Sequence, residues 1–268
     1  VRKTKQVFVH KIKDFLLQQS DQILIFAFVS LKMVAYYGNY TMVITRITML
    51  FSTMMGGIVA GVGNLIAEGD GQKIYRVFWE MLFVHYLVAG IVVFAVYQGI
   101  QPFICLWLGE EYLLSSTILL LLLVNSFIML SRGAVDLFNT GYGNYHDTWS
   151  AWVEGAINIS VTLITCSLWG LPGVLIGKIA SILPIIVIWK PLFLYRAGFK
   201  RSTAHYWKNI AVILACFACS FVVASTCARL LPLNPYHNFM EWVGYCLILT
   251  ALFSLLYLSS LLLLTEGA

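Results

Sequence analysis

Charged residues are scarce in this chain: they make up 11% of its 268 residues, whereas 60% of the residues are hydrophobic. A soluble domain of this length covers its surface with polar and charged groups, and this composition does not supply enough of them. The mean hydropathy is +0.84. The composition therefore excludes a water-soluble globular protein and predicts a protein whose solvent is lipid.

Long polar links are missing as well. Apolar stretches of about 20 residues, the length that crosses a bilayer as a helix, follow one another with short connections. Because a helix satisfies its own backbone hydrogen bonds in lipid, the pattern predicts an all-α polytopic membrane protein with about eight transmembrane helices. The eight predicted spans are residues 12–31, 37–66, 77–99, 114–138, 148–169, 171–194, 208–230 and 241–264.

The cysteines do not form a recognisable framework for disulfides or metal. Cys216 and Cys219 have CxxC spacing, but no second pair and no nearby histidine completes a zinc site. The run from Gly173 to Lys178 is one residue short of a phosphate-binding loop and lacks the following Ser or Thr. We therefore predict no metal, no cofactor and no catalytic residue.

The basic residues flank the apolar stretches instead of forming one long basic face, so the net charge of +5 does not indicate nucleic acid. With a cytoplasmic N-terminus, twelve lysines and arginines fall on the cytoplasmic side and only Lys32 and Arg229 on the other. The positive-inside rule then places both termini in the cytoplasm. The expected location is the cell inner membrane. No cleavable signal peptide precedes the first span, and the start at Val1 suggests that an N-terminal part is missing.

Two opposite charges are expected near the middle of the membrane. Asp21 lies about ten residues into the first span and Arg46 about ten residues into the second, which puts both near the midplane at about 1.5 Å per residue. They could line a hydrated cavity, or they could form a structural ion pair between adjacent helices. The sequence leaves both interpretations open.

A second polar group is expected toward the cytoplasmic half. Arg132 and Asp136 are four residues apart and share one helix face, and Glu154 could reach a similar depth. This group forms either one functional network or a salt bridge that pins two helix ends. Lys178 and His85 are weaker candidates.

Glycines and a proline mark two spans. Gly57 and Gly61 have GxxxG spacing in the second span, and Gly173 and Gly177 have it in the sixth, where Pro184 predicts a kink. Such positions serve close helix packing, or bending and sliding during transport. The stretch 102–113 is predicted to lie along the outer membrane interface.

Several short motifs, in this order, resemble polysaccharide-export flippases of the Wzx type. These flippases belong to the multidrug, oligosaccharidyl-lipid and polysaccharide exporter superfamily. The motifs are Ser20-Asp21-Gln22-Ile23-Leu24-Ile25, Tyr36-Tyr37-Gly38-Asn39-Tyr40, Gly63-Asn64-Leu65-Ile66-Ala67-Glu68-Gly69-Asp70, Pro102-Phe103-Ile104-Cys105-Leu106-Trp107-Leu108-Gly109 and Gly170-Leu171-Pro172-Gly173-Val174-Leu175-Ile176-Gly177.

The resemblance implies the C-terminal part of a 14-helix exporter. Residues 1–195 would form the six-helix C-terminal lobe and residues 196–268 two additional helices, with the N-terminal lobe missing from this chain. The implied function is translocation of an undecaprenyl-pyrophosphate-linked oligosaccharide for O-antigen, capsule or exopolysaccharide biosynthesis. The lipid-linked oligosaccharide and membrane lipids are the expected partners, nucleic acid is not, and other polysaccharide assembly proteins are further candidates.

A pyrophosphate group needs cationic partners, and Arg46, Arg132 and Lys178 are the fully ionised cations within the predicted spans. Asn64, Asn125 and Asn158 could bind sugar hydroxyls. The candidate substrate-binding residues are Arg46, Asp21, Arg132, Asp136, Lys178 and Asn64. The alternatives are a drug or cation antiporter of the same superfamily and a membrane-embedded polysaccharide polymerase or ligase. Short, nearly uncharged outer links favour a transporter over an enzyme.

Overall fold

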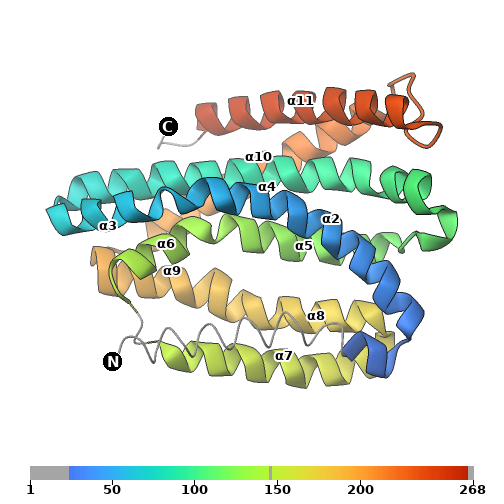
Figure 1. Ribbon diagram of the computed structural model, residues 1–268. Coiled ribbons are helices and arrows are strands. Elements are labelled where there is room, and N and C mark those ends of the chain that lie inside the picture. The colour runs from blue at the N-terminus through green and yellow to red at the C-terminus, as the bar shows by residue number, and fades with distance from the viewer. Residues whose placement is uncertain (1–23, 145–146, 265–268) are drawn as a thin grey trace.

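The computed structural model describes residues 24–144 and 147–264. Every element of regular structure in these two ranges is helical, and most of the helices lie side by side along one direction (Figure 1). Their bounds are α2 (Leu31–Gly56), α3 (Val59–Glu68), α4 (Gly71–Leu108), η1 (Glu110–Tyr112), α5 (Ser116–Ser131), α6 (Gly133–Gly141), α7 (Thr148–Trp169), α8 (Leu171–Ile182), η2 (Leu183–Trp189), α9 (Lys190–Phe193), η3 (Leu194–Phe199), α10 (Ala204–Ala228) and α11 (Phe239–Leu264). The element η1 is a 3-10 turn, whereas η2 and η3 are π-helical.

The described helices include 6 spans that are long and apolar enough to cross a membrane, and α2 with α3 adds a seventh if this bent pair counts as one span. The chain is therefore a polytopic membrane protein, as its composition predicted. Most of the predicted first span, 12–31, lies outside the described residues, so the total of eight stays a prediction. The predicted span 148–169 coincides with α7, and the last three predicted spans match α8 to η3, α10 and α11 with shifts of a few residues.

Helices α7 and α8 form an antiparallel hairpin with a one-residue turn. Gly170 ends α7 and begins α8 with φ +62°, a conformation that glycine adopts without a steric penalty. The helical run then continues from Leu171 to Phe199. Its π-helical part begins at Leu183, next to Pro184, where the sequence predicted a kink.

Helix α4 is the central helix of the described bundle, in contact with α5 and α6 on one side and with α10 and α11 on the other (Figure 1). Its 38 residues make it about 57 Å long, nearly twice the ~30 Å hydrocarbon layer. The prediction of a separate interfacial segment at 102–113 is therefore wrong in its bounds, because Pro102 to Leu108 are the last turns of α4.

Beside the proline, the indole N–H of Trp242 in α11 donates to the Gly99 carbonyl at 2.9 Å. Pro102 has no N–H to donate to the Gln98 carbonyl, so this bond from a neighbouring helix lies one residue beyond the gap in the α4 ladder.

The predicted second span is two helices instead of one. Helix α2 begins at Leu31, where the Ser30 side chain accepts a hydrogen bond from the Met33 amide, and α2 and α3 meet at an angle of 42°. A Cβ on Gly57 or Gly61 would meet nothing within 4 Å. These two glycines therefore do not mark a tight helix contact within the described part of the chain.

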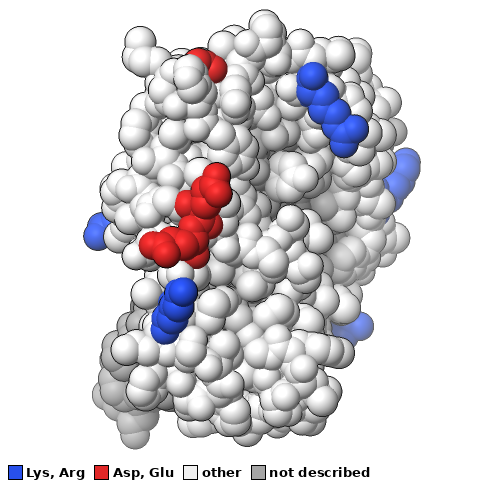
Figure 2. Space-filling model, turned by 90° about the vertical axis from the view of Figure 1, so that its right-hand side faces the viewer, with Lys and Arg blue, Asp and Glu red and all other residues white. Residues whose placement is uncertain are grey.

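The two ends of the bundle differ in charge. Figure 2 shows the end where α4 passes into η1 and α5: most of this face is uncharged, with a few separate basic side chains and one strip of acidic side chains. The element η1 at this end contains Glu110 and Glu111. Lys32 and Arg229 also belong to this end. The elements that meet at the opposite end contain Lys73, Arg76, Lys190, Arg196, Lys200, Arg201 and Lys208. The chain therefore places most of its described basic residues at one end of the bundle.

Candidate functional site

A cavity of about 310 Å³ lies between α2, α4 and the span formed by α5 and α6. Its wall is largely apolar and includes Phe51, Met55, Leu130 and Leu137. His85 from α4 and Asp136 from α6 bring polar groups to the same wall. An apolar cavity with few polar groups is the usual form of a site for an organic or amphipathic ligand.

Both helices that face α4 across this cavity are interrupted beside it. Helix α2 ends at Gly56, a wall residue, before the bend into α3. Helix α5 ends at Ser131 and α6 begins at Gly133, another wall residue, with Arg132 between them. At membrane depth, irregular backbone is tolerated where it is buried or lines a cavity, and interrupted helices are typical of transport sites.

His85 is held in one orientation. Its Nδ1 lies 2.8 Å from the Met81 carbonyl oxygen, which can only accept, so Nδ1 is the donor. The ring meets Phe51 edge to face with centroids 5.2 Å apart. A Cβ on Gly133 would lie 2.3 Å from Nε2 of His85, so the glycine makes room for the imidazole. The sequence analysis ranked His85 as a weak candidate, because a single histidine in an apolar span carries little signal.

Arg132 and Asp136 form an ion pair between Nε and a carboxylate oxygen, with side chains 21% and 33% exposed. The sequence predicted that these two residues share one helix face, and the ion pair confirms that they do. Asp136 also lines the cavity. Its partner Arg132 stands between α5 and α6, where the span is interrupted. The pair places a cation and an anion beside an apolar space.

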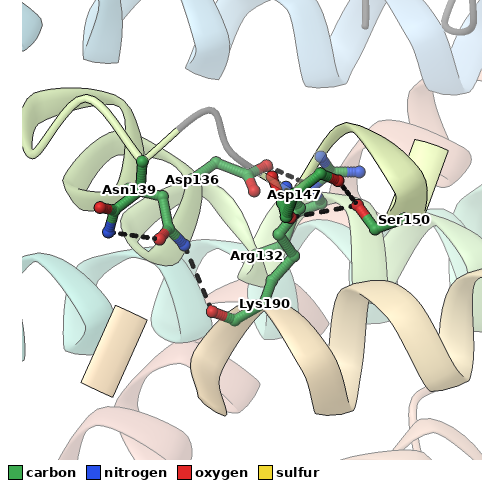
Figure 3. Close-up of polar contacts among 7 residues, drawn as sticks. Arg132, Asp136, Asn139, Asp147, Ser150 and Lys190 are labelled. Atoms are coloured by element: carbon green, nitrogen blue, oxygen red, sulfur yellow. Dashed lines mark hydrogen bonds and ion pairs between the residues drawn. The ribbon is translucent and has the colours of Figure 1, made fainter. Parts of the chain in front are cut away.

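A second ion pair joins α7 to α9 (Figure 3). The Lys190 ammonium lies 2.7 Å from Oδ2 of Asp147, and Ser150 donates to the same carboxylate oxygen at 3.1 Å. The Asp147 side chain is 1% exposed and that of Lys190 15%. Asn139 in α6 donates to the Lys190 carbonyl at 3.3 Å. These contacts tie the ends of α6, α7 and α9 together.

Polar side chains also follow one buried face of α7. Glu154, Asn158, Thr162 and Thr165 are each at most 9% exposed and recur every three or four residues. This face packs against α8, where the Thr165 hydroxyl donates to the Gly173 carbonyl at 2.7 Å. The spacing of these residues was a readable signal in the sequence, but Glu154 and Asn158 were named there for other reasons, Glu154 for its depth and Asn158 as a sugar-binding candidate.

The other predicted site residues do not line this cavity. Arg46 lies on an exposed face of α2, Asn64 is exposed on α3 and Lys178 is half-buried on α8. Asp21 lies outside the described residues, so the predicted pairing of Asp21 with Arg46 stays a prediction. Among the described residues, the cavity therefore brings together Asp136 and His85, with Arg132 behind Asp136.

Sequence reasoning missed the pairing of Asp147 with Lys190. Lys190 was counted as one of the residues that flank the membrane, and Asp147 stands in a short link. The two residues are 43 positions apart, and only the return of α9 to the start of α7 brings them together.

No group of histidine, cysteine or acidic side chains in the part of the chain that the structure describes could hold a metal ion. The six cysteines are free, with Cys216 buried and Cys219 exposed on α10. This separation does not suit a shared ligand. The buried position of Cys216 suits a small packing residue.

Comparison with known proteins gives no relative: no family model, no curated protein and no solved structure matches the chain.

Proposed function

We propose that this chain translocates an anionic, lipid-linked oligosaccharide from the cytoplasmic to the outer leaflet, as part of a polysaccharide-export flippase. The expected substrate is an undecaprenyl-pyrophosphate-linked glycan of O-antigen, capsule or exopolysaccharide synthesis. The observation that carries the proposal is the apolar cavity between two interrupted helices, with the Arg132–Asp136 ion pair at its side. The apolar wall suits part of a lipid, and a guanidinium beside it suits a phosphate.

A specific observation favours a second candidate, a cation antiporter. Asp136 is a charged residue of the cavity wall. Arg132 is not a wall residue, and it contacts the cavity's Asp136 as an ion-pair partner. An organic cation would use the carboxylate directly. The two functions therefore assign opposite importance to the two members of one ion pair.

The discriminating experiment compares Arg132→Gln with Asp136→Asn in the complete transporter, reconstituted into liposomes with a fluorescent undecaprenyl-pyrophosphate glycan. A flippase loses at least about tenfold in rate with Arg132→Gln, because a charge-assisted hydrogen bond of ~1.5–3 kcal/mol is lost, and loses less with Asp136→Asn. Uptake of a fluorescent organic cation is measured in parallel. Greater sensitivity to Asp136→Asn, together with cation uptake, would reject the flippase.

Two further variants complete the design. Lys73→Gln removes a cation whose pair with Glu68 is exposed at the end of the bundle, and it should leave transport unchanged. Arg46→Ala tests the other predicted pyrophosphate partner, which lies outside the cavity: if the substrate headgroup binds there, glycan transport is lost while the protein remains inserted. Arg46→Lys should restore transport only in part, since a lysine makes no bidentate contact with phosphate.

A further inference from the structure

The link between η3 and α10 carries a group of basic side chains with no acidic residue near them in the sequence, since no aspartate or glutamate stands between Glu154 and Glu241. Other basic residues at the same end, Lys73, Arg76 and Lys190, each have a carboxylate partner. The described part of the chain gives no such partner to the exposed cations of the link, which are Arg196, Lys200, Arg201 and Lys208.

Arg201 lies over an aromatic surface formed by Tyr75, Tyr195 and Phe199. The carbon of its guanidinium is 4.2 Å from the centroid of the Tyr75 ring on α4. Phe199 meets that ring edge to face with centroids 5.5 Å apart, and the Tyr75 hydroxyl lies 3.3 Å from that of the fully buried Tyr195. A cation–π contact holds a guanidinium in place without using a hydrogen-bond acceptor, so the N–H groups of Arg201 are available to a further partner.

Lys200 has a backbone conformation that a lysine rarely adopts. It ends η3 with φ +54°, in the left-handed region where glycine is the usual residue. Among the described residues other than glycine, it alone has a positive φ. After this turn the Arg201 amide donates to the Tyr195 carbonyl at 3.1 Å. A glycine would make the turn with less strain, and the chain has a second exposed cation there instead.

The link lies at the headgroup level of the membrane. Helix α10 has 25 residues and is about 37 Å long, a few Å more than the ~30 Å hydrocarbon layer. Its first turn contains Tyr206 and Trp207, and such residues are enriched where hydrocarbon meets headgroups. Arg201, just before α10 begins, is therefore level with the lipid phosphates. The acyl chains then lie beside α10, whose exposed apolar side chains include Leu214.

We propose that Arg201 and Lys200 bind the phosphate of an anionic phospholipid in the leaflet at this end of the bundle. The phosphate accepts hydrogen bonds from the Arg201 guanidinium, which the aromatic surface holds in place, and Lys200 adds a second positive charge. Basic groups between membrane helices on the cytoplasmic side are a known form of binding site for anionic headgroups. The inference does not depend on the proposed function, because it concerns a bound membrane lipid and not the transported substrate.

The first measurement is native mass spectrometry of the full chain in a non-ionic detergent, titrated with phosphatidylglycerol or with phosphatidylcholine. The affinity for the first phosphatidylglycerol should fall at least about tenfold in Arg201→Gln, the loss expected for one charge-assisted hydrogen bond. Arg201→Lys should lose less, because it keeps the charge and loses the bidentate contact. Phosphatidylcholine has no net charge, and its affinity should be the same in all three proteins.

A second variant, Lys200→Gly, separates lipid binding from folding. Glycine adopts φ +54° freely, so the melting temperature in detergent should be at or above that of the wild type. The affinity for phosphatidylglycerol should nevertheless fall about fivefold, as expected for one basic residue at an anionic lipid surface. Unchanged phosphatidylglycerol affinity in either Arg201→Gln or Lys200→Gly would overturn the proposal.

Two control variants show whether the lipid recognises this site or only the total charge. Arg76→Gln removes a cation at the same end, 3.9 Å from the Glu80 carboxylate, and Arg229→Gln removes an exposed cation at the opposite end. Each should change the phosphatidylglycerol affinity by less than about twofold. Losses as large as that of Arg201→Gln would overturn the site.

Inorganic pyrophosphate is the last competitor, because it has the phosphate chemistry without acyl chains. At a concentration equal to that of the lipid it should leave phosphatidylglycerol bound. Displacement of the lipid would identify a site for a soluble phosphate and overturn the assignment to a phospholipid.

Discussion

At the scale of single residues, the pair of Asp147 with Lys190 is expected to be sensitive to substitution because it is buried. Both side chains are largely buried, and loss of one partner removes a buried ion pair and its hydrogen bond. We expect Lys190→Met or Asp147→Asn to lower the free energy of unfolding by ~3–5 kcal/mol, and the double variant to cost less than the sum of the two. Unfolding in mixed detergent, followed by circular dichroism, measures each term of this cycle.

The exposed pair of Lys73 with Glu68 is the matched control for that cycle. Its N–O distance of 2.6 Å is comparable, but its side chains are 44% and 55% exposed. Solvent screens such a pair, so its coupling should be within ~0–1 kcal/mol. Equal coupling energies for the two pairs would show that burial does not decide the strength of the interaction.

At the scale of helices, the α7–α8 hairpin depends on a glycine with no room for a side chain. A Cβ on Gly173 would lie 2.1 Å from the Thr165 carbonyl oxygen. Gly173→Ala must therefore separate the two helices, and we expect a loss of ~1–3 kcal/mol or more. Gly155→Ala on α7 meets nothing within 4 Å and should be neutral or slightly stabilising. Thermal denaturation of both variants in the same detergent tests the contrast, and equal losses would contradict the role of Gly173.

Helix positions could be predicted from the sequence because a membrane leaves few alternatives to a helix for an apolar stretch of sufficient length. The ends were harder to predict, since α4 continues past Pro102 into residues that resemble an interfacial segment. The bend between α2 and α3 was only one of two interpretations of the glycines in the sequence, because glycine spacing by itself does not separate a packing contact from a bend.

Contacts in the candidate site could be predicted only where both residues lie close together in the sequence. The approach of Arg132 to Asp136 follows from helix periodicity over four residues, and it is present. The meeting of His85 with Gly133 and that of Asp147 with Lys190 join residues 48 and 43 positions apart, and both depend on how the helices pack. No pattern along a single helix contains that information.

At the scale of the whole molecule, most of the described lysines and arginines lie at one end of the bundle, where η3 ends and α10 begins. Links rich in lysine and arginine are retained on the cytoplasmic side during insertion. Lys200, exposed between η3 and α10, should therefore face the cytoplasm, whereas Glu110, exposed in η1 at the opposite end, should face outward.

A labelling experiment tests this orientation in intact cells. In a background with the six native cysteines replaced by serine, Glu110→Cys should react at once with a membrane-impermeant maleimide. Lys200→Cys should react only after the membrane is permeabilised, because the bilayer keeps the reagent from the cytoplasmic end. The labelling of the two sites can be compared directly, since both residues are exposed in short links and differ mainly in the end of the bundle at which they lie. Ready labelling of Lys200→Cys with protection of Glu110→Cys would invert the molecule in the membrane, and with it the direction in which the cavity would have to carry its substrate.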